Sequence, residues 1–331
     1  MRKVDRGEDL SVDQTRLAFD EIFTGGIADE YIAQFLLNLT KKGETVDELT
    51  GAVLSMRAKA ITIEAPDNAM DIVGTGGDQT HTLNISTAAA FVVAACGVPV
   101  AKHGNRAASS RSGSSDVLRE LGVNLEPELA VLEQCLREEN LCFLFAPRHH
   151  PAMRRVAAIR RKLGVRTIFN LLGPLTNPAN VRRHLIGVYE LEWLVPMAET
   201  LDRLGTETAW LVHGQDDMDE ITTTAATDLV SLRDGLINRG TLTPEEFSIS
   251  RAHLSALHGE NAISNATAMR HLFDGTMGAY RDIVLMNAGA ALTVAGKVNT
   301  MKKGIALAAE ALDNGDAQAV LDKIVRLTNR G

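Results

Sequence analysis

Two stretches of glycine and small polar residues, close together in the chain, could bind a phosphorylated ligand. They read Gly74-Thr-Gly-Gly-Asp78 and Asn84-Ile-Ser-Thr87. Glycines let backbone N–H groups converge on an anion, and a helix that begins near Asn84 would add the positive end of its dipole. The alternative is a plain glycine turn capped by Asn84. Because such turns are common, these two stretches alone favour phosphate binding only narrowly.

A second loop carries cations, an amide and hydroxyls directly after a short apolar run. It comprises Lys102-His-Gly-Asn-Arg106 and continues through the serine-rich stretch Ser109–Ser115. A solvated basic loop is the alternative interpretation. Two such loops after neighbouring strands would enclose one ligand, so we favour a shared phosphate site.

Adjacent acids at Asp219 and Glu220 follow an apolar run that ends at His213. Mg²⁺ takes few protein oxygens and shares the phosphates of its substrate, so an acidic pair at the end of a strand suits it. A solvated acidic turn is the alternative. Opposite a phosphate site, the pair favours metal.

A basic stretch from His150 to Gly164 is expected to form a helix. Most of its arginines should be solvated, but Arg160 could bind a substrate carboxylate with paired hydrogen bonds if it faces the cleft. His103 and His150 flank the same region, although a lone histidine is more often structural than catalytic.

The elements that must position these residues fall into two groups. Residues 1–69 predict a small helical domain, with capping boxes at Ser11-Val-Asp-Gln14 and Thr45-Val-Asp-Glu48. Residues 70–331 alternate short apolar runs with longer helical ones, which predicts a large α/β domain with a mostly parallel sheet flanked by helices. Ligands in such sheets bind beyond the carboxyl ends of the strands. Residues 151–180 interrupt the alternation and are either a hinge or a return to the helical domain.

Within the second group, the runs that we expect to be strands are 71–73, 98–101, 141–145, 185–188 and 209–213, with one or two more near 227–232. Helices are expected over 86–96, 114–121, 127–139 and 191–204, and from 261 to the end.

Composition excludes several classes of protein. The chain of 331 residues has a net charge of −8 and only 4% aromatic residues, which argues against a nucleic-acid-binding surface. Its three cysteines include no CxxC pair and are expected to be buried free thiols. The first residues lack an apolar signal core, and no apolar run is long enough to span a membrane, so we expect a cytoplasmic protein with no membrane partner.

Together these motifs resemble the anthranilate phosphoribosyltransferases. The resemblance starts near Thr15 and includes the stretches above together with Arg166-Thr-Ile-Phe-Asn-Leu-Leu-Gly-Pro-Leu-Thr-Asn-Pro178. It implies a nucleoside phosphorylase/phosphoribosyltransferase-like fold with a hinge at about 151–180 that packs back onto the helical domain. It implies a homodimer through that helical domain, Mg²⁺, and transfer of phosphoribose from 5-phosphoribosyl 1-pyrophosphate to anthranilate in tryptophan biosynthesis.

The resemblance also assigns site residues, and none acts as a strong general base. Those for phosphoribosyl pyrophosphate are Gly74, Gly76, Gly77, Asp78, Thr82, Asn84, Ser86, Thr87, Lys102 and Ser114. Those for anthranilate are Gly74, His103, Asn105, His150, Arg160 and Gly173. The Mg²⁺ ligands would be Ser86, Asp219 and Glu220.

Departures from the family pattern bear on the glycine-rich loop. Gln79 stands where the family has glycine, which questions the geometry of the loop but not the class of reaction. Leu83, Arg111 and His258 also differ from the usual residues. Two alternative functions remain: a nucleoside phosphorylase of the same fold, and a non-enzymatic nucleic-acid-binding relative.

Overall fold

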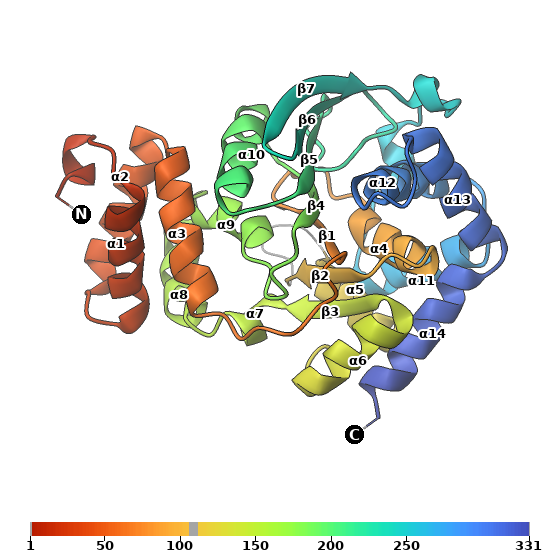
Figure 1. Ribbon diagram of the computed structural model, residues 1–331, viewed down its shortest axis with the longest axis horizontal. Coiled ribbons are helices and arrows are strands. Elements are labelled where there is room, and N and C mark those ends of the chain that lie inside the picture. Colours follow the sequence, from red (N-terminus) through yellow and green to blue (C-terminus); the bar gives the residue numbers. More distant parts are fainter. Residues whose placement is uncertain (1, 106–111, 331) are drawn as a thin grey trace.

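The computed structural model describes residues 2–105 and 112–330. At the N-terminus, three helices form a bundle: α1 (Val12–Thr24), α2 (Asp29–Lys42) and α3 (Val46–Ala58). Both predicted capping boxes are present, at Ser11 and Thr45. In Figure 1 this bundle lies at one end of the molecule, beside the sheet rather than on top of it.

A seven-stranded sheet forms the centre of the rest of the chain, in the order β3-β2-β1-β4-β5-β6-β7. The first five strands of that order are parallel, and β6 and β7 are antiparallel additions. The sheet therefore matches the predicted fold class. The strands are β1 (Met70–Gly74), β2 (Val100–Gly104), β3 (Leu141–Phe145), β4 (Arg183–Gly187), β5 (Thr208–Gly214), β6 (Thr227–Arg233) and β7 (Leu236–Leu242).

Helices cover both faces of the sheet, as Figure 1 shows, and the apolar core divides into two clusters. One cluster lies under α4, α6 and the C-terminal helices. The other joins the N-terminal bundle to α8, α9, α10 and one face of β4 and β5. The remaining α-helices are α4 (Ile85–Ala95), α5 (Ser114–Glu120), α6 (Leu129–Glu139), α7 (Ala146–His149), α8 (Met153–Leu163), α9 (Phe169–Leu175), α10 (Leu194–Arg203), α11 (Ala262–Phe273), α12 (Ala279–Val294), α13 (Met301–Asp313) and α14 (Asp316–Thr328).

The segment that broke the sequence pattern contains helix α9. Its residues Gly173 and Pro174 lie inside the last turn, and both are poor helix formers. Burial on nearly every side of α9 also removes the amphipathic period that would have revealed a helix. Phe169 packs against Phe19 of helix α1 with ring centroids 5.5 Å apart, so this segment contacts the bundle.

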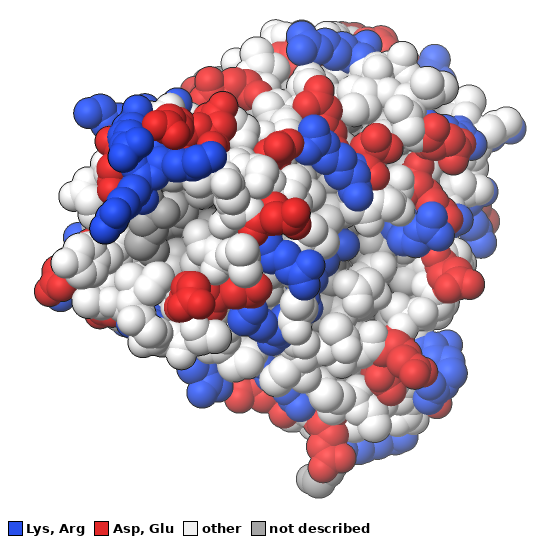
Figure 2. Space-filling view, turned by 60° about the vertical axis from the view of Figure 1, so that its left-hand side comes forward, with Lys and Arg blue, Asp and Glu red and all other residues white. Residues whose placement is uncertain are grey.

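No helix among the described residues is long and apolar enough to cross a membrane. On the face drawn in Figure 2, acidic and basic side chains are interspersed. All three cysteines are buried free thiols, as predicted.

Candidate active site

The site forms where the strand order reverses, between β1 and β4. After β1 the chain adds β2 and β3 on one side of this point, and β4 and β5 lie on the other side. The two sets of connections diverge, which leaves a crevice at the carboxyl ends of the strands. Both strands end in glycine, at Gly74 and Gly187, and the chain around Asp219 folds down onto them. A Cβ atom at Gly187 would overlap the carbonyl oxygen of Asp219. Glycine is required here because another stretch of backbone occupies the space of its side chain.

The two predicted acids lie against the two predicted phosphate-binding stretches. Asp219 Oδ2 accepts a hydrogen bond from the Gly76 N–H at 2.7 Å, and Glu220 Oε1 accepts one from the Ser86 N–H at 3.0 Å. Burial, together with the nearby carboxylates of Asp78 and Glu220, raises the pKa of Asp219 well above its usual range. Desolvation also raises the pKa of Glu220, to about 7. Backbone donors suited to an anion are thus held by the protein's own carboxylates.

Lys102 connects the second loop to the same place. Its Nζ donates to the carbonyl oxygen of Ile72 at 2.5 Å and to Ser86 Oγ at 3.2 Å. Lys102 is buried, and desolvation lowers its pKa while Asp71, Glu220 and Asp219 oppose that shift. The ammonium group therefore lies between the sheet and the start of helix α4, beside both acids.

Asn84 does not cap helix α4, the role that the alternative interpretation gave it. It precedes helix α4, but its side chain makes no capping hydrogen bond. Its Nδ2 donates to the carbonyl oxygen of Ser112, and its Oδ1 accepts from Asn265 Nδ2 at 2.9 Å. Glu220 takes the Ser86 N–H instead, so the helix start is satisfied by an acid from a distant loop.

On the other side of the crevice, His103, His150 and Gly173 come together. His103 Nδ1 lies 3.0 Å from the carbonyl oxygen of Gly173, and the two imidazole rings are 5.1 Å apart. Burial lowers the pKa of His103 to about 3 and that of His150 to about 4. Both rings are therefore neutral near pH 7. The Nε2 atoms of both rings are buried and lack a hydrogen-bond partner among the described residues.

Arg160 is partly buried on helix α8 and stacks over the ring of Phe169, with Cζ 5.6 Å from the centroid. Burial lowers the pKa of this guanidinium. No ion pair within 4.0 Å is formed by Arg160 in the part of the chain that the structure describes. A desolvated guanidinium in this state is suited to an external carboxylate.

The remaining predicted residues lie around these contacts. Ser114 Oγ donates to the carbonyl oxygen of Asn105 at 3.3 Å, which closes the second loop onto helix α5. Thr87 is buried within α4, and Thr82 forms an isolated β-bridge with His258. No hydrogen bond or ion pair between described residues joins Thr82 or Arg160 to the acids. Arg106 and Ser109–Arg111 lie outside the described residues.

The glycine-rich loop itself adopts left-handed backbone angles. Gly76 and Gly77 have φ of 68° and 82°, and Gln79 has φ of 61°. A left-handed conformation costs a residue with a side chain more than glycine. The departure at Gln79 therefore falls at a position where glycine would be favoured.

Several positioning residues escaped the sequence analysis. Asp71 is fully buried, accepts from the His103 N–H at 3.1 Å, and accepts from Asn177 Nδ2 at 2.7 Å. Burial raises the pKa of Asp71 to about 6. The sequence signal for Asp71 was the presence of a charged residue in an otherwise apolar strand. Asn265, which orients Asn84, is distant in the sequence and offered none.

The residues present fit Mg²⁺. Among the described residues, no group of three or more His, Cys, Asp and Glu side chains has metal-binding geometry. Mg²⁺ does not need one, because it is commonly held by one or two carboxylates and completed by water and substrate phosphates. Burial is the main cause of the raised pKa values of Asp219 and Glu220, and a divalent cation beside them would favour their charged forms.

A helical bundle joined to this α/β domain, with buried acids and Lys102 at the switch point, is the arrangement of a class of glycosyl transferases. Residues 1–60 match the model of the glycosyl transferase family helical bundle domain, and residues 66–318 match that of its a/b domain. An anthranilate phosphoribosyltransferase of Mesorhizobium japonicum is 54% identical over 327 residues, covering 99% of this chain and 97% of the relative.

Solved structures of anthranilate phosphoribosyltransferases have the same fold as this chain. The anthranilate phosphoribosyltransferase of Thermus thermophilus has a TM-score of 0.94 and 42% identity, covering 99% of this chain and 98% of that one. The Saccharomyces cerevisiae enzyme in complex with PRPP and Mg has a TM-score of 0.90 and 25% identity, with 99% and 96% covered. The chain belongs to the anthranilate phosphoribosyltransferase family.

Proposed function

We propose that this chain transfers the 5-phosphoribosyl group from 5-phosphoribosyl 1-pyrophosphate to anthranilate, giving N-(5-phosphoribosyl)anthranilate and pyrophosphate, in tryptophan biosynthesis. One observation carries the proposal. The glycine-rich loop, the start of helix α4, Lys102 and the acidic pair converge at the switch point of the sheet. The curated relatives named for this activity support the assignment.

The demanding step is departure of pyrophosphate from the ribose carbon, while positive charge grows on the sugar ring. In our proposal, Lys102 and the N–H groups of Gly76 and Ser86 stabilise the leaving group. Asp219, Glu220 and Ser86 would hold Mg²⁺, which supplies charge neutralisation for the pyrophosphate when bound. Asp219 and Glu220 would then exchange their present hydrogen bonds for the cation.

The acceptor side needs no strong base. The amine of anthranilate is already a free nucleophile at neutral pH, so the enzyme has only to orient it. Neutral His103 and His150, Asn105 and the Gly173 carbonyl are proposed to surround the ring and amine. Arg160 is proposed to pair with the carboxylate, because burying that charge without a partner would be costly.

We further propose that residues 1–69 and 70–331 act as two domains, with 151–180 as the hinge. A homodimer through the helical domain is supported by large apolar side chains exposed there, at Leu17 and Tyr31. Buried free cysteines support action in the cytoplasm.

The direct test follows anthranilate fluorescence in the presence of phosphoribosyl pyrophosphate and Mg²⁺. We expect fluorescence to fall with time, and to stay constant when chelator removes the metal. Phosphorolysis of thymidine or uridine without loss of anthranilate would instead identify a nucleoside phosphorylase. A mobility shift of nucleic acid at physiological salt, again without turnover, would identify a binding protein.

A further inference from the structure

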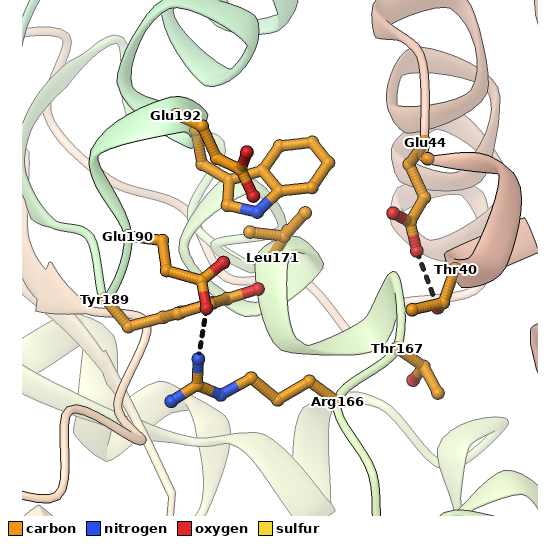
Figure 3. Close-up of a pocket in the computed structure, with 10 residues that line it drawn as sticks. Thr40, Glu44, Arg166, Thr167, Leu171, Tyr189, Glu190 and Glu192 are labelled. Carbon is orange, nitrogen blue, oxygen red and sulfur yellow. Dashed lines mark hydrogen bonds and ion pairs between the residues drawn. The ribbon is translucent and has the colours of Figure 1, made fainter.

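Arg166 connects the hinge segment to the glycine-rich loop. Its Nη2 donates to the carbonyl oxygen of Gly77 at 2.6 Å, and its Nη1 donates to Glu190 at 2.5 Å. The guanidinium also stacks on the ring of Tyr189, with Cζ 4.2 Å from the centroid. Figure 3 shows Arg166 reaching toward Glu190, with the ring of Tyr189 beside it. One side chain thus bonds to two segments that are distant in the sequence.

The same two segments meet again at Thr75. The Tyr189 N–H donates to Thr75 Oγ1 at 3.0 Å, and the Thr75 N–H donates to the Gly187 carbonyl oxygen at 2.9 Å. These bonds fix the beginning of the glycine-rich loop on the end of strand β4. Beyond Thr75, Gly76 and Gly77 have no side chains, so their orientation depends on contacts made by their backbone.

Fixing the carbonyl of Gly77 also fixes the next N–H group. In a trans peptide the carbonyl oxygen and the following N–H lie on opposite sides of one plane. Arg166 therefore sets the direction of the Asp78 N–H, which must point away from the guanidinium. The ion pair with Glu190 is itself partly exposed and contributes little to stability. Arg166 therefore matters mainly because it orients the backbone of the glycine-rich loop.

Packing alone does not hold Arg166 in place. It lines a pocket of about 240 Å³ between the end of helix α2 and residues 189–193. Figure 3 shows that pocket, with Thr40 and Glu44 on its far side. The pocket leaves room beside the guanidinium of Arg166. Its contacts with the Tyr189 ring and Glu190, rather than close packing, therefore keep it in position.

We propose that Arg166 is a positioning residue for phosphoribosyl pyrophosphate: held by Tyr189 and Glu190, it presets the glycine-rich loop for the pyrophosphate. This inference rests on the proposed function. It also predicts how tightly the glycine-rich loop is held in substrate-free protein, and hydrogen exchange measures this without any substrate.

The test compares Arg166→Gln, Arg166→Lys, Tyr189→Leu and Tyr189→Phe, with Arg251→Gln as a control. Arg251 also pairs with a glutamate, Glu245, but at an exposed site elsewhere. In Arg166→Gln we expect faster hydrogen exchange at residues 75–79 in substrate-free protein, and unchanged exchange in helix α14. Affinity for phosphoribosyl pyrophosphate should fall about fivefold or more, the effect of losing one such hydrogen bond. The anthranilate KM should change less than about twofold, because Arg166 orients only the loop for the other substrate.

The conservative variants separate orientation from charge. Arg166→Lys keeps the charge but loses the fork and the stack, so it should resemble Arg166→Gln. Tyr189→Phe should resemble wild type, and Tyr189→Leu should resemble Arg166→Gln. Unchanged loop exchange, full rescue by lysine, or equal weakening of both substrates would overturn the proposal. If wild type bound no phosphoribosyl pyrophosphate, the proposed function would fail, while the exchange result would still test whether Arg166 orients the loop.

Discussion

The two sides of the crevice satisfy their polar groups in opposite ways. On the side of Asp219 and Glu220, charged groups and backbone donors bind one another, so a ligand must displace contacts that already exist. On the side of His103 and His150, neutral rings are buried with unpartnered nitrogen atoms among the described residues. In the proposed function, the first side receives the charged pyrophosphate and the second receives the flat ring of anthranilate. The difference teaches that a ligand would have to replace existing hydrogen bonds on the first side, whereas on the second side it could bond to buried nitrogen atoms that have no partner among the described residues.

Removing the acids tests the charged side most severely. We expect Asp219→Ala with Glu220→Ala to lower Mg²⁺-dependent turnover at least about a hundredfold, because the leaving group loses its electrostatic support. The fold should remain, since the backbone hydrogen bonds of these two carboxylates go to a loop and to the start of a helix. Circular dichroism and steady-state kinetics check both points. The exposed neighbour Asp217→Asn is the control, and a double variant with normal turnover would refute the metal assignment.

Acidification tests the neutral side. The pKa of folded His103 is about 3, against 6.5 for the free side chain, so protonation favours the unfolded state. Burial of the neutral His103 ring therefore leaves the free energy of unfolding at its full value above pH 6.5. That free energy falls as the pH drops toward 3. Between about pH 7 and 5, wild type should lose about 2 kcal/mol more unfolding free energy than His103→Gln. Denaturant unfolding at both pH values measures this, and the exposed His271→Gln should lose as much as wild type.

Arg160 tests whether the neutral side receives a carboxylate. We expect Arg160→Ala to raise the anthranilate KM about tenfold or more, the cost of losing one partner of a shielded charge pair. The KM for phosphoribosyl pyrophosphate should change little, and Arg160→Lys should recover only part of the loss. Arg161→Ala, exposed on the same helix, is the matched control. An unchanged anthranilate KM would mean that another cation binds the carboxylate or that the acceptor differs.

Gln79 offers the smallest and finest adjustment of the charged side. Its φ of 61° is the conformation that glycine adopts readily, so Gln79→Gly should relieve backbone strain and admit the pyrophosphate more closely. We expect the KM for phosphoribosyl pyrophosphate to fall about twofold to threefold, which corresponds to part of the backbone strain of about 1 kcal/mol or more. His81→Gly, with φ of 53°, controls for flexibility alone. A higher KM would show that the loop already accommodates glutamine.

The sequence predicted the parts of the molecule that depend on local pattern. The first five strands and the helix at Ser114 followed from apolar runs and punctuation, and the two capping boxes were recognised from four residues each. The loops that we propose to bind phosphate and the acidic pair were singled out because their residue types are unusual after a buried strand.

What the sequence could not show depends on contacts between distant residues. The alternative interpretation, in which Asn84 only caps helix α4, is wrong, because Asn265 and the Ser112 carbonyl bond to its side chain while Glu220 bonds to the helix start. Helix α9 was hidden because it is buried all round and carries a proline. The orientation of a side chain such as that of Asn84, at a junction of three loops, is decided by tertiary packing. Such packing produces no periodic pattern in the sequence.

The glycines at the ends of β1 and β4 have a consequence for how this protein tolerates sequence change. The backbone of Asp219 rests where the Cβ atom of Gly187 would be, and the carboxylate of Asp219 crowds the same position at Gly74. A methyl group at Gly187 would push the backbone of the acidic loop away from the sheet, and one at Gly74 would displace the Asp219 carboxylate, while every charged residue stayed in the chain. Catalytic power would then be lost without losing a catalytic residue. In variants of this enzyme, an alanine at a strand end should be regarded with the same suspicion as the loss of an aspartate.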